Sequence, residues 1–176
     1  MTTQKYNVLF LCTGNSARSI IAEAVLKKDC SEKFNAFSAG SHPKGEVNPF
    51  AIKVLNDNDY PTDGFYSKSW NVFEEQNAPK MDFIITVCDS AANEVCPVWI
   101  GHPVTAHWGI EDPAAVEGTD IDKLRAFNTA LKYLRNRVHQ LDAIPIDRLD
   151  RLTISSRLKE IGKTSEGATT QAKVEK

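Results

Sequence analysis

The sequence predicts one α/β domain in which a parallel sheet is covered by helices on both faces. Short apolar runs of strand length, at residues 7–11, 36–39, 83–87 and 104–108, alternate with segments of helical periodicity. Such alternation is typical of parallel sheets. The 176 residues, 41% of them hydrophobic, are enough for one sizeable core, and no internal repeat divides them.

The predicted strands are short. Asn7–Leu11 and Phe83–Val87 are almost continuously apolar, as expected of strands that are buried on both faces of a sheet. Ala36–Ala39 forms another short strand, closed by Gly40, and Val104–Trp108 completes the set. We therefore expect four strands.

The predicted helices follow from spacing and from capping residues. The first begins at Ser19, because Ile21 and Val25 then share one face. Asn48 is a typical cap for a helix over residues 49–56, which has proline at its first position. The strongest helix has apolar residues at steps of three and four: Leu124, Phe127, Leu131, Leu134, Val138 and Leu141.

The C-terminal part of the chain changes character after Pro145. A short amphipathic segment containing Leu158 and Ile161 extends the predicted catalytic domain to residues 1–162. Residues 163–176 contain almost no apolar side chains. We expect this stretch to be a disordered tail.

Charge and hydropathy exclude several classes of function. The net charge of −2 gives no basic excess that would indicate a nucleic-acid or membrane partner. No apolar run approaches the ~18 residues of a membrane span. The short polar segment Met1–Lys5 lacks the features of a secretory signal, so we expect a cytoplasmic protein. Any site for an anion must then be built locally, by a loop.

Four cysteines, at positions 12, 30, 88 and 96, could form two structural disulfides. The absence of a secretory signal favours reduced or catalytic thiols instead. The spacing of Cys88 and Cys96 is not that of a zinc site, and the scattered histidines complete no metal set, so we expect no bound metal. Cys30, at the end of the first helix, is expected to be a bystander.

The loop after the first strand has the pattern C-x5-R-S, from Cys12 to Ser19. A loop between a parallel strand and a helix lies at the sheet edge where α/β proteins bind ligands. Its backbone N–H groups and the helix dipole favour an anion, and Arg18 offers a fork for two oxygens. Gly14 would permit a turn that a side chain blocks. The expected oxyanion-binding residues are Thr13, Gly14, Asn15, Ser16, Ala17 and Arg18.

The same loop would activate the thiol of Cys12. A cysteine at a helix N-terminus beside Arg18 has a depressed pKa and is thiolate at neutral pH. Ser19 could donate a hydrogen bond to that thiolate, and Asn15 could hold the shape of the loop. The alternative is that Cys12 ends a buried strand as a small hydrophobic residue.

The run Val8–Ser19 resembles the signature of low-molecular-weight protein tyrosine phosphatases and of the arsenate reductases related to them. Phe37–Gly40 resembles the second strand of that family and its following turn, and the likeness extends from about Asn7 to about Leu141. It implies a flavodoxin-like three-layer sandwich with a four-stranded parallel sheet.

A second resemblance lies in His107–Ala114. In the family, an Asp-Pro pair stands over the anion loop and its aspartate is the general acid, which implies that role for Asp112. Tyrosine phosphatases usually have an aromatic residue after the proline, where this chain has Ala114. The stretch is similar to the arsenate-reductase branch. Alone, an Asp-Pro pair could equally be a surface turn.

The segment Val87–Pro97 resembles the part of the reductases that carries two redox cysteines. The resemblance implies that Cys12 attacks arsenate, that Cys88 resolves the adduct as arsenite leaves, and that Cys96 passes the disulfide outward. Two buried structural cysteines are the alternative.

An external thiol would then regenerate the enzyme. Ser67–Trp70 looks like relatives that use glutathione and glutaredoxin, but thioredoxin remains open. Some relatives bind an alkali cation near the loop, and Trp70 stands where an acidic ligand of that cation would be expected. Trp99 and Trp108 are expected to cover the flank of the site.

The leading hypothesis is an arsenate reductase whose anion loop also accepts phosphate or sulfate. The runner-up is a phosphatase acting on phosphotyrosine or small phosphate esters with the same Cys12, Arg18 and Asp112. A silent binding domain is the third possibility, and the three intact residues argue against it.

Overall fold

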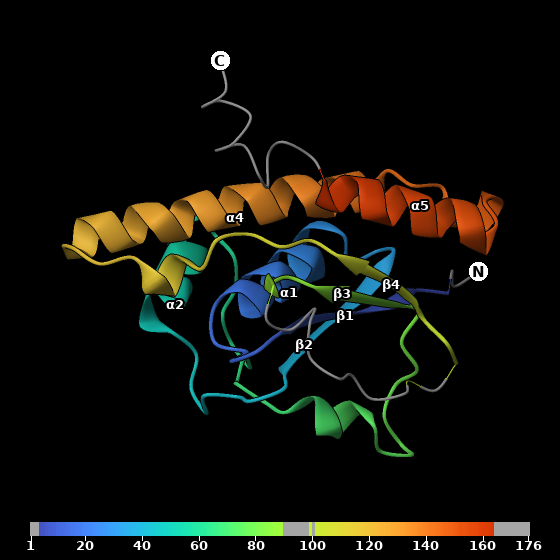
Figure 1. The fold of residues 1–176 in the computed structure, drawn as a ribbon, viewed down its shortest axis with the longest axis horizontal. Helices are drawn as coiled ribbons and strands as arrows, with labels where there is room; N and C mark the ends of the chain where they lie inside the picture. Colours follow the sequence, from blue (N-terminus) through green and yellow to red (C-terminus); the bar gives the residue numbers. More distant parts are fainter. Residues whose placement is uncertain (1–3, 90–98, 100, 164–176) are drawn as a thin grey trace.

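The computed structural model describes residues 4–89, 99 and 101–163. Its four strands form one parallel sheet in the order β2-β1-β3-β4 (Figure 1). Their bounds are β1 Tyr6–Cys12, β2 Phe34–Gly40, β3 Phe83–Thr86 and β4 Val104–His107. The predicted parallel four-stranded sheet is confirmed, and each strand includes or closely overlaps its predicted run.

Within the described residues, helices lie between the strands and after the last one. The α-helices are α1 Arg18–Asp29, α2 Pro49–Asp57, α4 Asp120–Asp142 and α5 Arg151–Gly162, and the 3-10 helices are η1 Trp70–Phe73, η2 Pro113–Ala115 and η3 Ile146–Arg148. As predicted, α2 begins after Asn48, whose side chain accepts a hydrogen bond from the backbone N–H of Phe50 at 2.8 Å. Helix α4 begins with a reciprocal capping box between Thr119 and Asp122.

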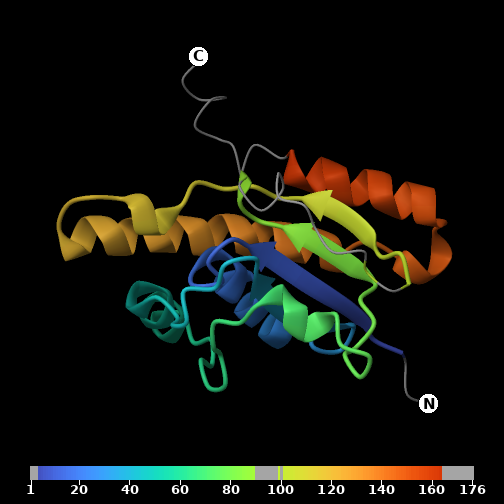
Figure 2. The same cartoon turned by 60° about the horizontal axis from the view of Figure 1, so that its bottom comes forward.

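The sheet separates two apolar layers. Successive side chains of a strand point to opposite faces, so Val8 and Phe10 join the large core, whereas Leu9 and Leu11 join a smaller one. The helices α1, α2, α4 and α5 contribute to the large core. Figures 1 and 2 show α4 and α5 on one side of the sheet and η1 on the other. This explains why β1 is apolar along nearly its whole length.

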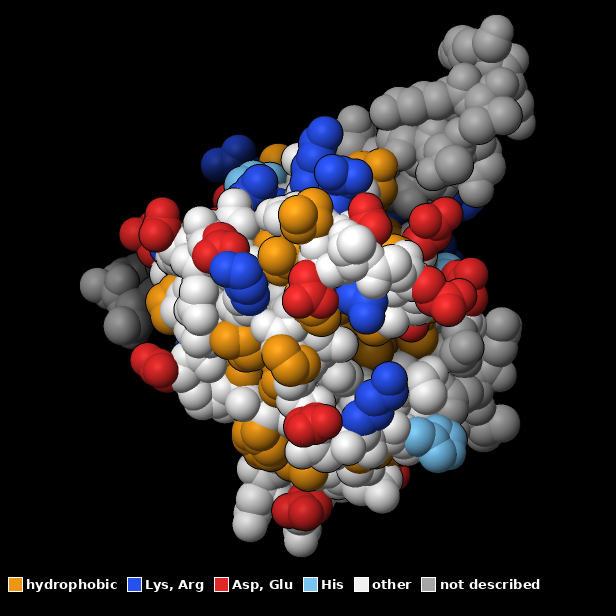
Figure 3. Space-filling view, turned by 90° about the vertical axis from the view of Figure 1, so that its left-hand side faces the viewer, with side chains coloured by type: hydrophobic (Ala, Val, Ile, Leu, Met, Phe, Trp, Pro, Cys, Tyr) orange, Lys and Arg blue, Asp and Glu red, His pale blue; other side chains and the backbone are white. Residues whose placement is uncertain are grey.

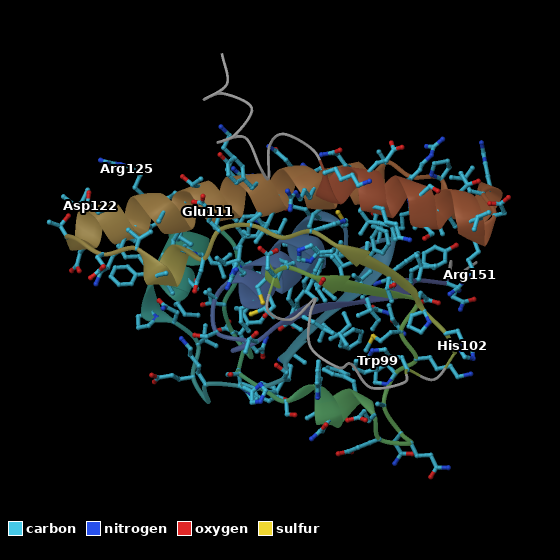
Figure 4. All side chains as sticks on the ribbon, in the orientation of Figure 1. Trp99, His102, Glu111, Asp122, Arg125 and Arg151 are labelled. Atoms are coloured by element: carbon cyan, nitrogen blue, oxygen red, sulfur yellow. The ribbon has the colours of Figure 1, made fainter. Side chains whose placement is uncertain are left out.

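The two tryptophans expected at the flank of the site lie elsewhere. Trp108 is fully buried, packs against Phe10 and donates from its indole N–H to the carbonyl of Leu158 at 2.9 Å, which ties α5 to the end of β4. Trp99 packs against the smaller core. It lies at the opposite end of the sheet from the loop that carries Glu111 (Figure 4). The expectation that they cover the flank of the site was therefore wrong. Both rings pack against apolar core residues instead.

Helix α5 contains the amphipathic segment described above, and it packs on β4 through a buried face that includes Ile154, Leu158 and Ile161. The expected tail falls on residues 164–176, outside the described residues, so disorder there stays a prediction. Within the described part of the chain, no helix is both long and apolar enough to cross a membrane.

The end of β2 packs tightly against the loop that follows β1. A Cβ atom added to Gly40 would lie 2.5 Å from the carbonyl oxygen of Thr13 and 2.9 Å from the amide nitrogen of Asn15. By contrast, a Cβ atom on Gly14 would meet only the flexible side chain of Lys44, at 3.2 Å. The expectation that Gly14 makes the turn possible is therefore wrong. Asn15 has the left-handed conformation in this loop, with φ of 44°.

We expect Gly40→Ala to destabilise the fold by about 1–3 kcal/mol, because a methyl group there must displace backbone atoms. Gly14→Ala is the matched control and should change the free energy of unfolding by less than ~0.5 kcal/mol. Urea denaturation of both variants measures the difference. Equal stability of the two variants would contradict the close packing of β2 on the loop.

Candidate active site

The loop from Cys12 to Arg18 lies at the carboxyl end of the central strand β1 and leads directly into α1. The N-cap residue Ala17 has no side chain that could cap the helix, and the first turn contains no acidic residue. The N–H groups of the first turn therefore lack side-chain partners, and the positive end of the helix dipole is not neutralised locally. Such a helix end is suited to bind an anion.

The carbonyl groups of this loop are held by the segment that follows β2. They accept backbone hydrogen bonds in three pairs: Thr13 O from His42 N at 2.9 Å, Gly14 O from Lys44 N at 3.0 Å, and Ser16 O from Asn48 N at 2.9 Å. In a planar trans peptide, the C=O and the following N–H point in opposite directions. The N–H groups of residues 14, 15 and 17 thus face away from that segment and can converge on an anion.

Asn15 holds the loop from inside. Its fully buried side chain accepts from the backbone N–H of Lys68 at 2.9 Å and donates to the hydroxyls of Ser19 at 2.8 Å and Ser38 at 3.0 Å. The hydroxyl of Ser38 donates to Glu23 at 2.5 Å, and burial raises the pKa of Glu23. The amide oxygen and the amide nitrogen of Asn15 thus both have hydrogen-bond partners, which suits the structural role expected for this residue.

Cys12 is almost completely buried, and its pKa is lowered from 9.0 to about 5. The largest cause is a hydrogen bond with the thiol of Cys88, and the hydroxyl of Ser19, the charge of Arg18 and the backbone of Asn15 act in the same direction. Burial opposes them, because it disfavours the charged form. Cys12 is therefore a thiolate at neutral pH.

Cys88 follows β3, the neighbour of β1, and is buried beside the anion loop. Its sulfur accepts a hydrogen bond from the backbone N–H of Thr13 at 3.3 Å. Cys30 caps the far end of α1, and burial raises its pKa to about 12, as suits a bystander. Cys96 lies outside the described residues, so its place in a relay stays a prediction.

Arg18 connects the anion loop to the loop that carries Asp112. Its guanidinium donates to the carbonyl of Ile110 at 3.0 Å, and a second nitrogen lies 3.6 Å from the carboxylate of Asp112. The other carboxylate oxygen of Asp112 accepts from the backbone N–H of Ala114 at 2.9 Å and caps η2. Asp112 is thereby held at the cavity that Cys12 also lines, with one carboxylate oxygen on the side of Arg18.

These groups share one cavity of about 250 Å³, lined by Cys12, Thr13, Gly14, Arg18, Cys88, Asp112 and Ala114 among others. His42 and Lys44 also line it, and neither was predicted from the sequence as a site residue. No sequence motif could have indicated these two residues. They reach the cavity because the backbone of their segment pairs with the anion loop. Acidic and basic side chains are interspersed on the end of the molecule where α4 begins (Figure 3). An anion would therefore be attracted by the groups of the loop itself and not by a basic surface around it.

We expect the alkylation rate of Cys12 to rise with pH through a midpoint of about 5, because only the thiolate reacts. Arsenate or sulfate should slow the reaction by occupying the loop. In Cys88→Ala the midpoint should move upward, since the largest stabilising hydrogen bond is gone. Peptide mass spectrometry of iodoacetamide-treated protein gives the rates, and Cys30 is the internal control. A midpoint near 9 with no protection by anions would contradict the site described here.

Known proteins resemble this chain in sequence and in fold. The model of the low molecular weight phosphotyrosine protein phosphatase family matches residues 7–151. "Arsenate reductase 1" of Bacillus cereus is 39% identical over 121 residues, which cover 69% of this chain and 87% of that protein. An arsenate reductase of Oceanobacillus iheyensis is 34% identical over 131 residues, covering 74% and 91%.

A solved structure of an arsenate reductase in its phosphate-binding state superimposes with a TM-score of 0.65 at 28% identity, covering 78% of this chain and 97% of that one. The family match spans most of the chain and contains the anion loop, Cys88 and Asp112. The chain therefore belongs to the low-molecular-weight phosphotyrosine protein phosphatase family.

Proposed function

We propose that the protein reduces arsenate to arsenite through a covalent adduct on Cys12. The observation that carries this proposal is the position of Cys88: it lines the same cavity as Cys12, and its sulfur accepts a hydrogen bond from the backbone N–H of Thr13, the residue after Cys12, at 3.3 Å. Hydrolysis of a phosphate ester needs one nucleophilic sulfur, whereas reduction needs a second thiol within reach of the first. The relatives named arsenate reductases support the same choice.

In the first step, arsenate binds to the loop N–H groups and the guanidinium of Arg18. The Cys12 thiolate attacks arsenic, a sulfur–arsenic bond forms, and one arsenic–oxygen bond breaks. Asp112 delivers a proton to the departing oxygen, which leaves as water. Arsenic is still in the pentavalent state at this point.

In the second step, the sulfur of Cys88 attacks the sulfur of Cys12. The electron pair of the sulfur–arsenic bond passes to arsenic, which leaves as trivalent arsenite, while the two thiols are oxidised to a Cys12–Cys88 disulfide. Cys88 must lose its proton for this attack, and the N–H of Thr13 at 3.3 Å stabilises the resulting thiolate.

The third step needs an external thiol reductant, because the disulfide must be reduced for another turnover. Glutathione with glutaredoxin, or thioredoxin, can supply the two electrons. If Cys96 takes part, it attacks Cys88 and carries the disulfide away from the anion loop. Cys96→Ser then abolishes turnover with a thioredoxin-like reductant but has a smaller effect when glutathione resolves the first disulfide.

The second candidate function is hydrolysis of phosphotyrosine or small phosphate esters. It uses the same attack by Cys12 and the same proton donor, and water then cleaves the phospho-cysteine. Ala114 argues against phosphotyrosine as the main substrate, because it lines the cavity with a methyl group instead of an aromatic ring that could stack on the substrate. Low activity on small esters is compatible with the reductase.

We expect Cys88→Ser to abolish arsenate turnover and to preserve any hydrolysis of p-nitrophenyl phosphate, since water and not a second sulfur completes that reaction. Cys12→Ser should abolish both activities, and Cys30→Ser, the matched control, should preserve both. Arsenate-dependent NADPH oxidation with a coupled thiol system measures reduction. Melting curves exclude unfolding. Unchanged arsenate reduction by Cys88→Ser would reject the relay and favour an external thiol that acts directly on Cys12.

A further inference from the structure

Helix α4 contains a fully buried arginine that does not line the cavity of Cys12. Arg137, in α4, has no exposed surface, and its guanidinium makes one hydrogen bond, from Nη1 to the carbonyl of Gly109 at 3.2 Å. Its Nε and Nη2 have no hydrogen-bond partner within residues 4–89, 99 and 101–163. Burial lowers the pKa of Arg137 to about 10, so it remains charged at neutral pH.

The stability of the fold does not explain this residue. Leu134, Val138 and Leu141 form the buried stripe of α4 around it. A buried charge with incomplete pairing is costly, and an apolar residue of similar volume is often as stable or more stable at such a position. A residue that breaks the apolar pattern without a gain in stability points to a role in function.

The carbonyl that Arg137 holds belongs to the loop of Asp112. Gly109 and Ile110 are neighbours in this loop, and their carbonyls accept from two arginines: Gly109 from Arg137 in the core, and Ile110 from Arg18 in the anion loop, at 3.0 Å. Glu111 and then Asp112 follow directly. Figure 4 shows Glu111 on the segment that runs from the end of β4 toward the start of α4.

Gly109 lies close to the ends of two side chains. A Cβ atom there would lie 2.6 Å from the imidazole nitrogen Nε2 of His107 and 2.7 Å from a carboxylate oxygen of Asp89. On either side of Gly109, the backbone N–H groups of Trp108 and Ile110 donate to the strand end at Thr86 and Val87, at 2.7 and 3.4 Å. The carbonyl of Gly109 is held from the other side, by a side chain of α4. Among the described residues, Arg137 is the donor of α4 that does so.

We propose that Arg137 is a positioning residue that fixes the loop of Asp112 relative to Cys12 and Arg18. Arg137 holds the loop at the carbonyl of Gly109, and Arg18 holds it at the carbonyl of the next residue, Ile110. With both in place, the carboxyl of Asp112 stays where the leaving oxygen needs its proton. The proposal rests on the proposed function only in assigning that proton transfer to Asp112.

The decisive variant is Arg137→Met, which keeps the length of the side chain but removes the charge and the donors. The melting temperature should be unchanged or raised. The rate of arsenate reduction should fall about tenfold, and by no more than the ~10²-fold that a small misplacement of a reacting group can cost. Arg137→Lys, which keeps the charge and one possible donor, should recover part of the rate. Lys132→Met, an exposed position of the same helix, is the matched control.

A double-mutant cycle shows whether Arg137 acts through Asp112. Adding Arg137→Met to Asp112→Asn should cause no further loss of rate, because the group that Arg137 positions is already gone. A full second loss in that background would overturn the proposal. So would failure of Arg137→Met to fold, because the charge would then be required for stability.

Amide hydrogen exchange separates this proposal from the proposed function. In Arg137→Met, the amides of residues 109–112 should exchange faster, while those in the middle of α4 stay protected. If the wild-type protein does not reduce arsenate, the proposed function is wrong, but the exchange measurement still tests the role of Arg137. Unchanged exchange in the loop would reject that role even in an active reductase.

Discussion

The N–H groups that follow Cys12 turn toward its sulfur because the carbonyl groups of the same loop are held by the segment after β2. This backbone pairing depends on Gly40, which lets β2 approach the loop closely. Helix α1 then begins without a side-chain cap, and its first N–H groups remain available. This arrangement places Arg18 and the cavity, and it contributes to the low pKa of Cys12, whose largest cause is the hydrogen bond with Cys88.

The sequence was sufficient for the fold and for the residues at the carboxyl ends of β1 and β4. Periodicity and caps act locally, so the start of α2 at Asn48 and the strand before Cys12 could be predicted. Features that depend on tertiary contacts could not. Trp108 packs into the core because α5 covers β4, and Gly40 is constrained by a loop remote in the sequence. Arg137 could have been noticed in the sequence, because it places a charge on the face of α4 that is otherwise apolar and buried.

The order of the strands determines which second sulfur can meet Cys12. Because β3 lies beside β1, the residue that follows its end, Cys88, reaches the anion loop without any movement of the sheet. Cys30 is equally buried but lies at the opposite end of α1. The loop, Arg18 and Asp112 would serve a phosphatase and a reductase alike, whereas a thiol after the third strand is needed only for reduction. The reductase chemistry adds a redox step to an anion site that already activates one thiolate.

The most direct test of the account is a single turnover without reductant. Fully reduced Cys96→Ser protein, which cannot pass the disulfide onward, is mixed with arsenate, and arsenite and disulfides are quantified by mass spectrometry. The account predicts one arsenite released for each Cys12–Cys88 disulfide formed. Arsenite release that leaves the thiols of Cys12 and Cys88 free, or no arsenite from a folded and alkylation-competent protein, would contradict it.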